Sequence, residues 1–321
     1  MRITLMVLAL AVTTASRPVL ADDPQPQYTN DIAIRQGIER AGGELIEAQA
    51  TTSNAELQEQ LTTRRQTQMP APGEFTLTED GEDLYDRADD GTLVIAGLFL
   101  CDHCDNYHAN SASGFVISEN GIAVTNYHVV ESEKNTTMVA MTRSGRVVPI
   151  IEVLAASQAD DIAIVRLGGD QPFTPVPIAR NAEVGETVHA ITHPSGRYYC
   201  YTSGEVSRFF MEPKGRRRPP VRRMQITADY ARGSSGGPIF NDAGQVVGMV
   251  TTTTSVYYNE ENGQQRNLQM VFKNTVPYQS ILDLFANEDA NEQADARNEN
   301  VQEDAEGQDA QDNAAASNDG A

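Results

Sequence analysis

The sequence predicts an all-β fold over residues 90–285, and three observations favour it. Short runs of apolar and β-branched residues recur along this stretch. Many of these runs are bounded by Gly, Pro or Asn, a pattern typical of β-sandwiches and barrels. Asn120-Gly121 lies between two of the runs, and an Asn-Gly pair in that position is a strong signal for a tight β-hairpin.

The expected strands form two groups, separated by residues 173–177, where alternating prolines mark a crossover. The first group is Thr92–Leu100, Ser113–Ser118, Ile122–Asn126, Met138–Met141, Val147–Val153 and Ile162–Leu167. The second group is Thr187–Thr192, Tyr199–Phe210, Met224–Ala228, Pro238–Asn241, Val246–Thr252 and Leu268–Asn274. A short helix over Pro277–Phe285 is expected to dock on the second group.

Residues 22–89 form a polar N-terminal extension that we expect to be partly helical or disordered. Leu57 and Leu61 are spaced i, i+4 and predict a helix from Ala55 to about Gln66. A second short helix is expected near Glu82–Ala88, just before the first strand. A propeptide, a linker and a packing arm all fit this composition.

Residues 1–21 are typical of a secretory signal peptide. Arg2 precedes an apolar stretch from Ile3 to about Val12, and Val19-Leu20-Ala21 fits a small-residue cleavage site. The apolar stretch is short for a membrane-spanning helix, so an uncleaved anchor is the weaker alternative. No other segment is apolar enough to cross a membrane. We therefore expect an exported protein, periplasmic or secreted, with no stable membrane span after signal cleavage.

Charge is concentrated in two segments. Residues 286–321 contain eleven acidic residues and one arginine, and so carry −10 of the formal charge of −21. With one valine and no aromatic residue, this acidic tail cannot bury enough apolar surface to fold, and we expect it to be disordered. The segment Lys214–Arg223 holds six basic residues. We interpret both segments as solvated. The alternative for the acidic tail is a polyanion that folds back on a basic site, and the alternative for the basic segment is a docking patch for acidic partners.

Three segments supply the residue types of a hydrolase with an activated serine, in the order His, Asp, Ser. His128 follows an expected strand, Asp161 opens an apolar run, and Ser235 lies in a glycine-rich turn. A serine hydroxyl is a poor nucleophile at neutral pH and needs an adjacent base, which His128 can be. Asp161 would orient the imidazole, with the neighbouring Asp160 as the alternative. The amides of Gly233 and Ser235 would stabilise the oxyanion that forms on attack.

These residues resemble the trypsin-like serine peptidases, and most closely the bacterial HtrA/Deg-type enzymes and their relatives that lack a PDZ domain. The shared motifs are Thr125-Asn126-Tyr127-His128-Val129-Val130, Asp161–Leu167, His193-Pro194-Ser195-Gly196 and Gly233–Pro238. The resemblance implies two six-stranded antiparallel Greek-key barrels, about 90–172 and 173–285, with the active site in the cleft between them. It implies no cofactor, and it allows a homo-oligomer, since HtrA-like enzymes are often trimers.

The chain departs from the wider family in three ways. No cysteine immediately follows His128, so the disulfide common near the catalytic histidine of animal trypsins is not expected. Ser234 stands where digestive trypsins carry the aspartate that pairs with a freshly cut N-terminus. No Ile-Val-Gly-Gly-like start is present, so activation by trimming a zymogen is not expected. Nothing that resembles a PDZ domain follows residue 285, so the usual peptide-binding regulator of the HtrA group is not expected.

Four residues are candidates for binding the substrate, all by resemblance. Counted back without gaps from the nucleophile, Asp229 falls where trypsins carry the acid at the base of the specificity pocket, which would favour cleavage after Arg or Lys. With a two-residue gap it becomes a structural acid instead, and Arg232 could pair with it. Thr251, Thr252 and Thr253 should form the pocket wall and the strand that pairs with an extended peptide.

The chain has three cysteines, Cys101, Cys104 and Cys200. In an exported protein a disulfide is the expected fate, either Cys101 to Cys104 or one of them to Cys200, leaving one thiol over. Free thiols are a second possibility. A zinc half-site is a third, because His103 and His108 lie near the Cys-x-x-Cys motif, but there is no second such motif and we expect no metal.

The sequence therefore predicts an exported serine endopeptidase, a hydrolase that cleaves polypeptides through an acyl-enzyme and acts on exported or misfolded proteins. The alternative is a non-catalytic, chaperone-like module that holds peptides in the same groove, and an esterase is a third class. No nucleic-acid partner is expected, because the basic segment 214–223 has no interleaved aromatic residues and the net charge is strongly negative.

Overall fold

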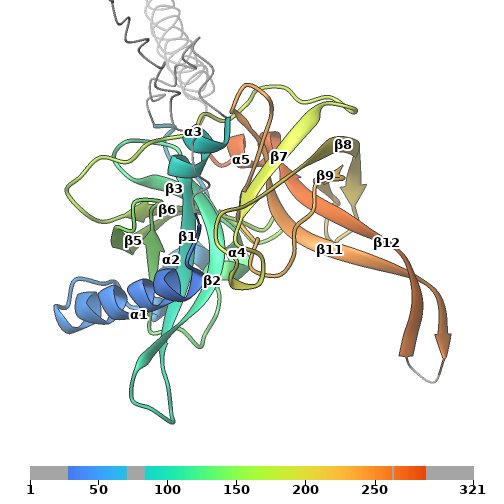
Figure 1. Ribbon diagram of the computed structural model, residues 1–321. Coiled ribbons are helices and arrows are strands. Elements are labelled where there is room, and N and C mark those ends of the chain that lie inside the picture. The colour runs from blue at the N-terminus through green and yellow to red at the C-terminus, as the bar shows by residue number, and fades with distance from the viewer. Residues whose placement is uncertain (1–27, 71–83, 262–263, 287–321) are drawn as a thin grey trace, which may run out of the picture.

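The computed structural model describes residues 28–70, 84–261 and 264–286. These residues form two closed antiparallel barrels of six strands each, which confirms the predicted fold class (Figure 1). The expected signal peptide, residues 1–21, and the acidic tail from residue 287 onward lie outside the described residues. None of the helices in the described ranges has the length and apolar character needed to cross a membrane.

The first barrel is closed in the order β1-β2-β3-β6-β5-β4, with β4 paired back to β1. Its strands are β1 (Thr92–Leu100), β2 (Tyr107–Val116), β3 (Ile122–Thr125), β4 (Thr137–Met141), β5 (Val147–Ser157) and β6 (Ile162–Leu167). Gly121 has φ +81°, which explains why a glycine follows Asn120 in the predicted turn. The apolar run Ile162–Val165 of β6 is fully buried, because one face of it fills the barrel and the other packs outward against neighbouring elements.

The second barrel is closed in the order β10-β11-β12-β9-β8-β7, with β7 paired back to β10. Its strands are β7 (Thr187–Thr192), β8 (Cys200–Glu212), β9 (Val221–Ile226), β10 (Pro238–Phe240), β11 (Val246–Glu261) and β12 (Gln264–Pro277), and the helix α5 (Tyr278–Leu282) follows. β11 and β12 run well beyond the predicted ends and leave the barrel as a two-stranded ribbon (Figure 1). Residues 252–255 are exposed and polar, so hydropathy alone gives no signal for this extension.

Two helices of the N-terminal region pack on the first barrel. α2 (Asn54–Thr63) matches the predicted helix, and Leu57 and Leu61 are fully buried in the core of that barrel. Ser53 caps this helix by accepting a hydrogen bond from the Glu56 amide. The packing-arm interpretation therefore fits the helices of residues 28–70, which pack on the first barrel.

The longest helix among the described residues, α1 (Asp31–Glu47), was not predicted. It contains Gly42 and Gly43, and glycine lowers helix propensity by about 1 kcal/mol per residue. The glycine at 42 has a packing role, because a Cβ there would collide with the side chain of Leu98 on β1. Ile38 of the same helix is fully buried against the barrel. The third helix, α3 (Leu84–Gly91), leads into β1 close to its predicted position.

Candidate active site

His128 and Asp161 meet at one edge of the first barrel. His128 lies on the single-turn helix α4 (Tyr127–Val130), which follows β3, and Asp161 lies directly before β6. Nδ1 of His128 is 2.9 Å from both carboxylate oxygens of Asp161, and its backbone amide donates to Oδ1 at 3.1 Å. Because Nδ1 is engaged by the carboxylate, Nε2 is left as the basic nitrogen that faces other groups.

Asp161 is held in place from both barrels. Its backbone has φ +67°, a left-handed conformation that aspartate tolerates better than most residues. The side-chain amide of buried Asn126 donates to its carbonyl oxygen at 2.8 Å. From the second barrel, the hydroxyl of Thr251 donates to Oδ2 at 2.6 Å. The carboxylate that orients His128 is therefore fixed by a residue of the opposite barrel.

Asp160, the alternative partner, is bound elsewhere. Its carboxylate accepts a hydrogen bond from the Ser157 hydroxyl at 2.7 Å, and its amide donates to the same oxygen. The structure brings His128 together with Asp161 and not with Asp160.

The electrostatic surroundings raise the pKa of His128. Burial alone lowers the pKa of this imidazole, but the hydrogen bond and the negative charge of Asp161 outweigh burial, and Glu131 adds to them. The side chain is still about half exposed, at 48% of its full area. An imidazole with a stabilised cationic form that faces solvent is suited to accept a proton and release it again.

Ser235 lies on the second barrel, in a turn that is bound to both barrels. The carbonyl of Ser235 accepts a hydrogen bond from the Ser113 amide of β2 at 2.8 Å, and the Gly236 amide donates to Val250 at 3.0 Å. Gly236 has φ +83°, and a Cβ there would collide with the Ser113 carbonyl. Ser235 itself is partly exposed. Ser235 and His128 both lie in the described part of the chain, and no hydrogen bond joins the Ser235 hydroxyl to His128.

The peptide bond between Arg232 and Gly233 has a fixed orientation. Ser195, in the turn η1 (Pro194–Gly196), donates its amide to the Arg232 carbonyl at 2.6 Å. The C=O and N–H of one trans peptide point in opposite directions, so this bond turns the Gly233 amide away from Ser195. Among the described residues, neither the Gly233 amide nor the Ser235 amide donates to another protein group. Both are available to a ligand oxygen.

His193 is a buried support for that turn. Its Nδ1 accepts from the Tyr199 amide at 3.0 Å, so Nε2 carries the proton and donates to the Leu93 carbonyl of the first barrel at 3.0 Å. Burial lowers the pKa of His193 to about 4. Its backbone amide donates to the hydroxyl of Ser113, and that hydroxyl donates to the Gly233 carbonyl at 3.1 Å. The His193-Pro194-Ser195-Gly196 motif therefore supports the backbone at Gly233.

The structure separates the candidate substrate-binding residues. Asp229 is 84% exposed and pairs with Lys273 at 3.1 Å, and not with Arg232 as one expectation had it. An acid at the base of a closed pocket would be shielded from solvent, so this exposure disfavours the pocket interpretation. Thr251 is buried and directs its hydroxyl to Asp161, whereas Thr252 and Thr253 are exposed on β11.

Sequence reasoning missed the positioning roles of Ser113, Asn126, Thr251 and His193. Asn126 and His193 lie inside motifs that were identified in the sequence, so those motifs could have pointed to them. Ser113 and Thr251 carried none, because each contacts a partner more than 85 residues away that only the fold brings near.

The three cysteines all lie in the described residues, and each is a free thiol. The expected disulfide is therefore not formed in this structure. The pKa of Cys101 is lowered chiefly by a hydrogen bond from the His103 backbone, and a second hydrogen bond with the Cys104 thiol lowers it further.

Comparison with known proteins agrees with this geometry. Residues 112–249 match the trypsin-like peptidase domain family. The chain is 34% identical over 146 residues to the mitochondrial serine protease HTRA2 of Bos taurus, an alignment that covers 44% of this chain and 31% of the relative. It is 30% identical over 150 residues to the chloroplastic Protease Do-like 1 of Arabidopsis thaliana, covering 45% and 34%.

A bacterial relative gives the same result. The serine endoprotease DegS of Haemophilus influenzae is 28% identical over 152 residues, which are 47% of this chain and 44% of DegS. Residues 112–249 are therefore similar to trypsin-like peptidase domains, including those of HtrA and Deg proteases, and the chain aligns with less than half the length of each of these relatives.

Proposed function

We propose that this trypsin-like peptidase domain makes the chain a serine endopeptidase, with Ser235 as nucleophile, His128 as base and Asp161 as the residue that orients the base. The observation that carries the proposal is the His128–Asp161 pair, held by Thr251 from the barrel that supplies Ser235. Each barrel contributes part of one Ser-His-Asp constellation, and such a constellation supports nucleophilic catalysis by serine.

The proposed reaction follows from the free atoms of the site. Oγ of Ser235 attacks the peptide carbonyl carbon, and its proton passes to Nε2 of His128. The oxyanion is stabilised by the amides of Gly233 and Ser235, each worth about 3–4 kcal/mol in comparable sites. Collapse breaks the C–N bond while His128 returns the proton to the leaving amine. Water, activated by the same base, then cleaves the acyl ester and regenerates the serine.

The substrate is proposed to be an unfolded or extended polypeptide. Thr252 and Thr253 are exposed on β11, beside the residue that contacts Asp161, and an extended peptide can pair with such a strand. The relatives are named as proteases, and misfolded or exported proteins are the class of substrate that the resemblance suggests. A homo-oligomer is proposed on the same ground, and sedimentation of the purified chain would test it.

Export is proposed from residues 1–21 alone. The two organellar relatives are named as mitochondrial and chloroplastic, so the compartment does not follow from the domain. Intact mass of the protein recovered from the exported fraction should correspond to a chain that begins at Asp22. A chain that keeps residues 1–21 would contradict the proposed cleavage.

The boundaries of the catalytic unit are proposed to begin before residue 90. α1 and α2 bury Ile38, Leu57 and Leu61 on the first barrel, so a fragment that starts at residue 90 would expose that surface. A fragment of residues 28–286 would keep all these contacts.

A fluorophosphonate probe tests the nucleophile directly, because it reacts with an activated serine. The wild-type chain is expected to gain one adduct by intact mass, and Ser235→Ala should gain none. Ser234→Ala is the matched control, since the Ser234 hydroxyl is buried and bonded to Thr192. Ser234→Ala should still be labelled. Labelling that survives Ser235→Ala would contradict the assignment.

One observation favours the second candidate, a non-catalytic peptide-binding module: the absence of a hydrogen bond between the described residues His128 and Ser235. Many catalytic hydrogen bonds tighten only when substrate is present. The labelling is therefore repeated with an added unfolded protein. No adduct under either condition, on a chain that binds the unfolded protein, would favour the binding module.

A further inference from the structure

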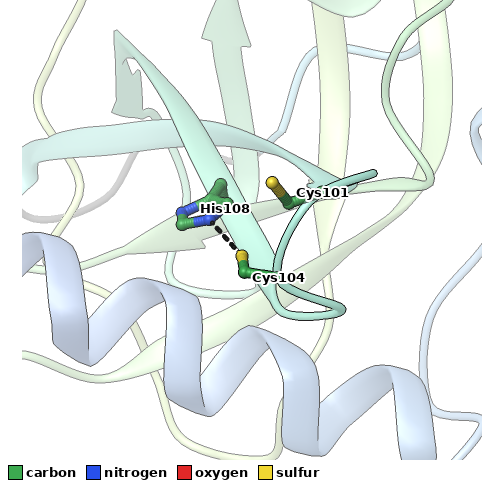
Figure 2. A group of neighbouring side chains, drawn as sticks. All are labelled: Cys101, Cys104 and His108. Carbon is green, nitrogen blue, oxygen red and sulfur yellow. Dashed lines mark hydrogen bonds between the residues drawn. The ribbon is translucent and has the colours of Figure 1, made fainter.

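We propose that Cys101, Cys104 and His108 form a binding site for a zinc ion on the loop between β1 and β2. Their ligand atoms, two sulfurs and a ring nitrogen of His108, all lie within 4.8 Å of one another. Figure 2 shows the three side chains converging on one side of this loop. The site lies outside the proposed active site, and its test needs no catalytic activity.

The loop geometry brings the three ligands together. Cys101 follows the last residue of β1, Cys104 lies in the turn, and His108 is the second residue of β2, where it pairs with Phe99. The Cys101 amide donates to the Asn106 carbonyl at 2.9 Å, which closes the loop. The hairpin thus brings the two cysteines of the Cys-x-x-Cys motif close to a histidine four residues later. A second Cys-x-x-Cys motif is therefore not needed to supply the third ligand.

The distances suit a tetrahedral ion. Zinc binds thiolate sulfur at about 2.3 Å and imidazole nitrogen at about 2.0 Å, so its ligand atoms lie about 3.5–3.8 Å from each other. Sγ of Cys104 is 3.2 Å from Nε2 of His108. Small rotations of these side chains would therefore admit the ion, because Cys104 is exposed and the other two are partly exposed.

A second contact orients the histidine. The carboxylate of Glu39, on α1, is 3.4 Å from Nδ1 of His108 and also accepts from the Ala109 amide. A carboxylate that accepts from Nδ1–H leaves the lone pair of Nε2 free and pointed at the sulfurs. Ligating histidines commonly have such a carboxylate partner, which fixes the ring and raises its basicity. This contact is the feature that the sequence could not reveal.

The donor set selects the class of metal. Two thiolates and one imidazole suit zinc, whereas calcium and magnesium require oxygen ligands. Two thiolates also balance the charge of a divalent cation, leaving a neutral site. Three protein ligands leave the fourth tetrahedral position to water, since Cys104 faces solvent.

The site would connect two elements. The ligands come from the β1–β2 loop, and Glu39 comes from α1, which lies across the first barrel (Figure 1). A bound ion would therefore fix the loop and, through the His108–Glu39 contact, its position relative to α1. Hydrogen exchange of residues 101–108 should slow when zinc is added to the reduced chain.

The competing state is a disulfide between Cys101 and Cys104, in which both thiols lose their hydrogen and neither can bind zinc as thiolate. The full chain is therefore purified from the compartment where it accumulates, without chelator or added reductant. Elemental analysis and intact mass are measured on the same sample. One equivalent of zinc with all thiols present supports the proposal. A chain 2 Da lighter, with Cys101 linked to Cys104 and no zinc, would overturn it.

Binding is then measured on the reduced, metal-free chain with zinc chloride and a chromophoric chelator as competitor. Cys101→Ser, Cys104→Ser and His108→Ala should each abolish stoichiometric binding. Glu39→Gln should weaken it about 10–100-fold, as expected for a second-sphere partner. Cobalt(II) added in place of zinc should give sulfur-to-metal charge-transfer bands that disappear in Cys104→Ser.

Two matched variants guard against misfolding. Cys200→Ser removes a cysteine outside the site, and His103→Ala removes a histidine of the same loop that is not a ligand. Both should keep one equivalent of zinc with unchanged affinity, and circular dichroism should show all variants folded. Loss of binding in Cys200→Ser or His103→Ala, or equal binding in Cys104→Ser, would overturn the assigned ligands.

Discussion

The two barrels differ in what covers them and in what they contribute to the site. The first barrel is covered by α1 and α2 and carries His128 and Asp161. The second barrel carries Ser235 and Thr251 and extends outward as the β11–β12 ribbon, on which Leu268 and Met270 are more than half exposed. One barrel is therefore reinforced from outside, whereas the other has exposed apolar surface away from its core.

This difference indicates which residues should affect the stability of the fold and which should affect the proposed catalysis. The barrels are joined at the site by a few hydrogen bonds, which run from Thr251 to Asp161, from Ser113 to Ser235 and from His193 to Leu93. Changes in the covered core of the first barrel should act on folding. Changes in the inter-barrel contacts should act mainly on the proposed reaction.

The largest effect is expected at the inter-barrel carboxylate. Asp161→Asn should keep the fold but lower kcat about 10⁴-fold, because an amide cannot hold the imidazole in the required tautomer. Hydrolysis of an unfolded protein substrate measures it. Asp160→Asn is the matched control and should retain most of the activity. Equal losses in both variants would argue that the acid is not specific to position 161.

The next comparison sets the covered core against the exposed ribbon. Leu61→Ala should lower the free energy of unfolding by about 2–5 kcal/mol, because Leu61 is fully buried between α2 and the first barrel. Leu268→Ala, on the ribbon, should change it by less than about 0.5 kcal/mol. Urea denaturation measures both. Similar values would mean that α2 is not part of the cooperative unit.

His193 should make stability depend on pH. Its pKa is about 4 when folded and 6.5 when unfolded, so between these values the unfolded chain binds more protons. The free energy of unfolding should therefore fall as the pH is lowered from about 6.5 to about 4, by about 3 kcal/mol from this group. His193→Asn should lose this component when urea denaturation is compared across that range. The same slope in both proteins would contradict a neutral, buried His193.

The smallest effect is expected from one hydroxyl. Thr251→Val removes the hydrogen bond to the Asp161 carboxylate, and bonds to charged groups contribute about 1.5–3 kcal/mol. We expect kcat/KM to fall about tenfold to a hundredfold, while KM changes little. Thr253→Val, two residues further along β11 at an exposed position, should have almost no effect on kcat. A loss confined to KM would indicate that Thr251 acts on substrate binding instead.

Much of the fold could be predicted because the barrel strands alternate with strong turn residues, as at Asn120-Gly121. What could not be predicted has identifiable causes. Gly42 and Gly43 weaken the helical signal of α1, and Gly42 lets the helix approach Leu98. The ribbon continues through exposed polar residues after Thr251, where backbone pairing and cross-strand side-chain hydrogen bonds, such as Asn274 to Thr254, maintain the strands.

The candidate site likewise has one part that the sequence could predict and another part that it could not. His128, Asp161 and Ser235 stand in recognisable motifs, and the structure brings the first two into contact. The roles of Ser113 and Thr251 depend on contacts between distant strands and leave no local pattern. Asp229 shows the limit of counting along the chain, since its position relative to Ser235 suggested a pocket acid and its side chain is exposed instead.

The order of the elements along the chain has a consequence for biosynthesis. His128, Asp161 and Ser235 all precede β12, the strand that pairs with both β9 and β11 to close the second barrel. Proteins generally fold from the N-terminal domain onward as they are made. In a growing chain, His128, Asp161 and Ser235 are therefore all present before β11, which carries Thr251, can pair with its second neighbour, β12. Residues near 284–286 then pair with Thr67. Under the proposed function, the catalytic site is therefore complete only after β12 has closed the second barrel.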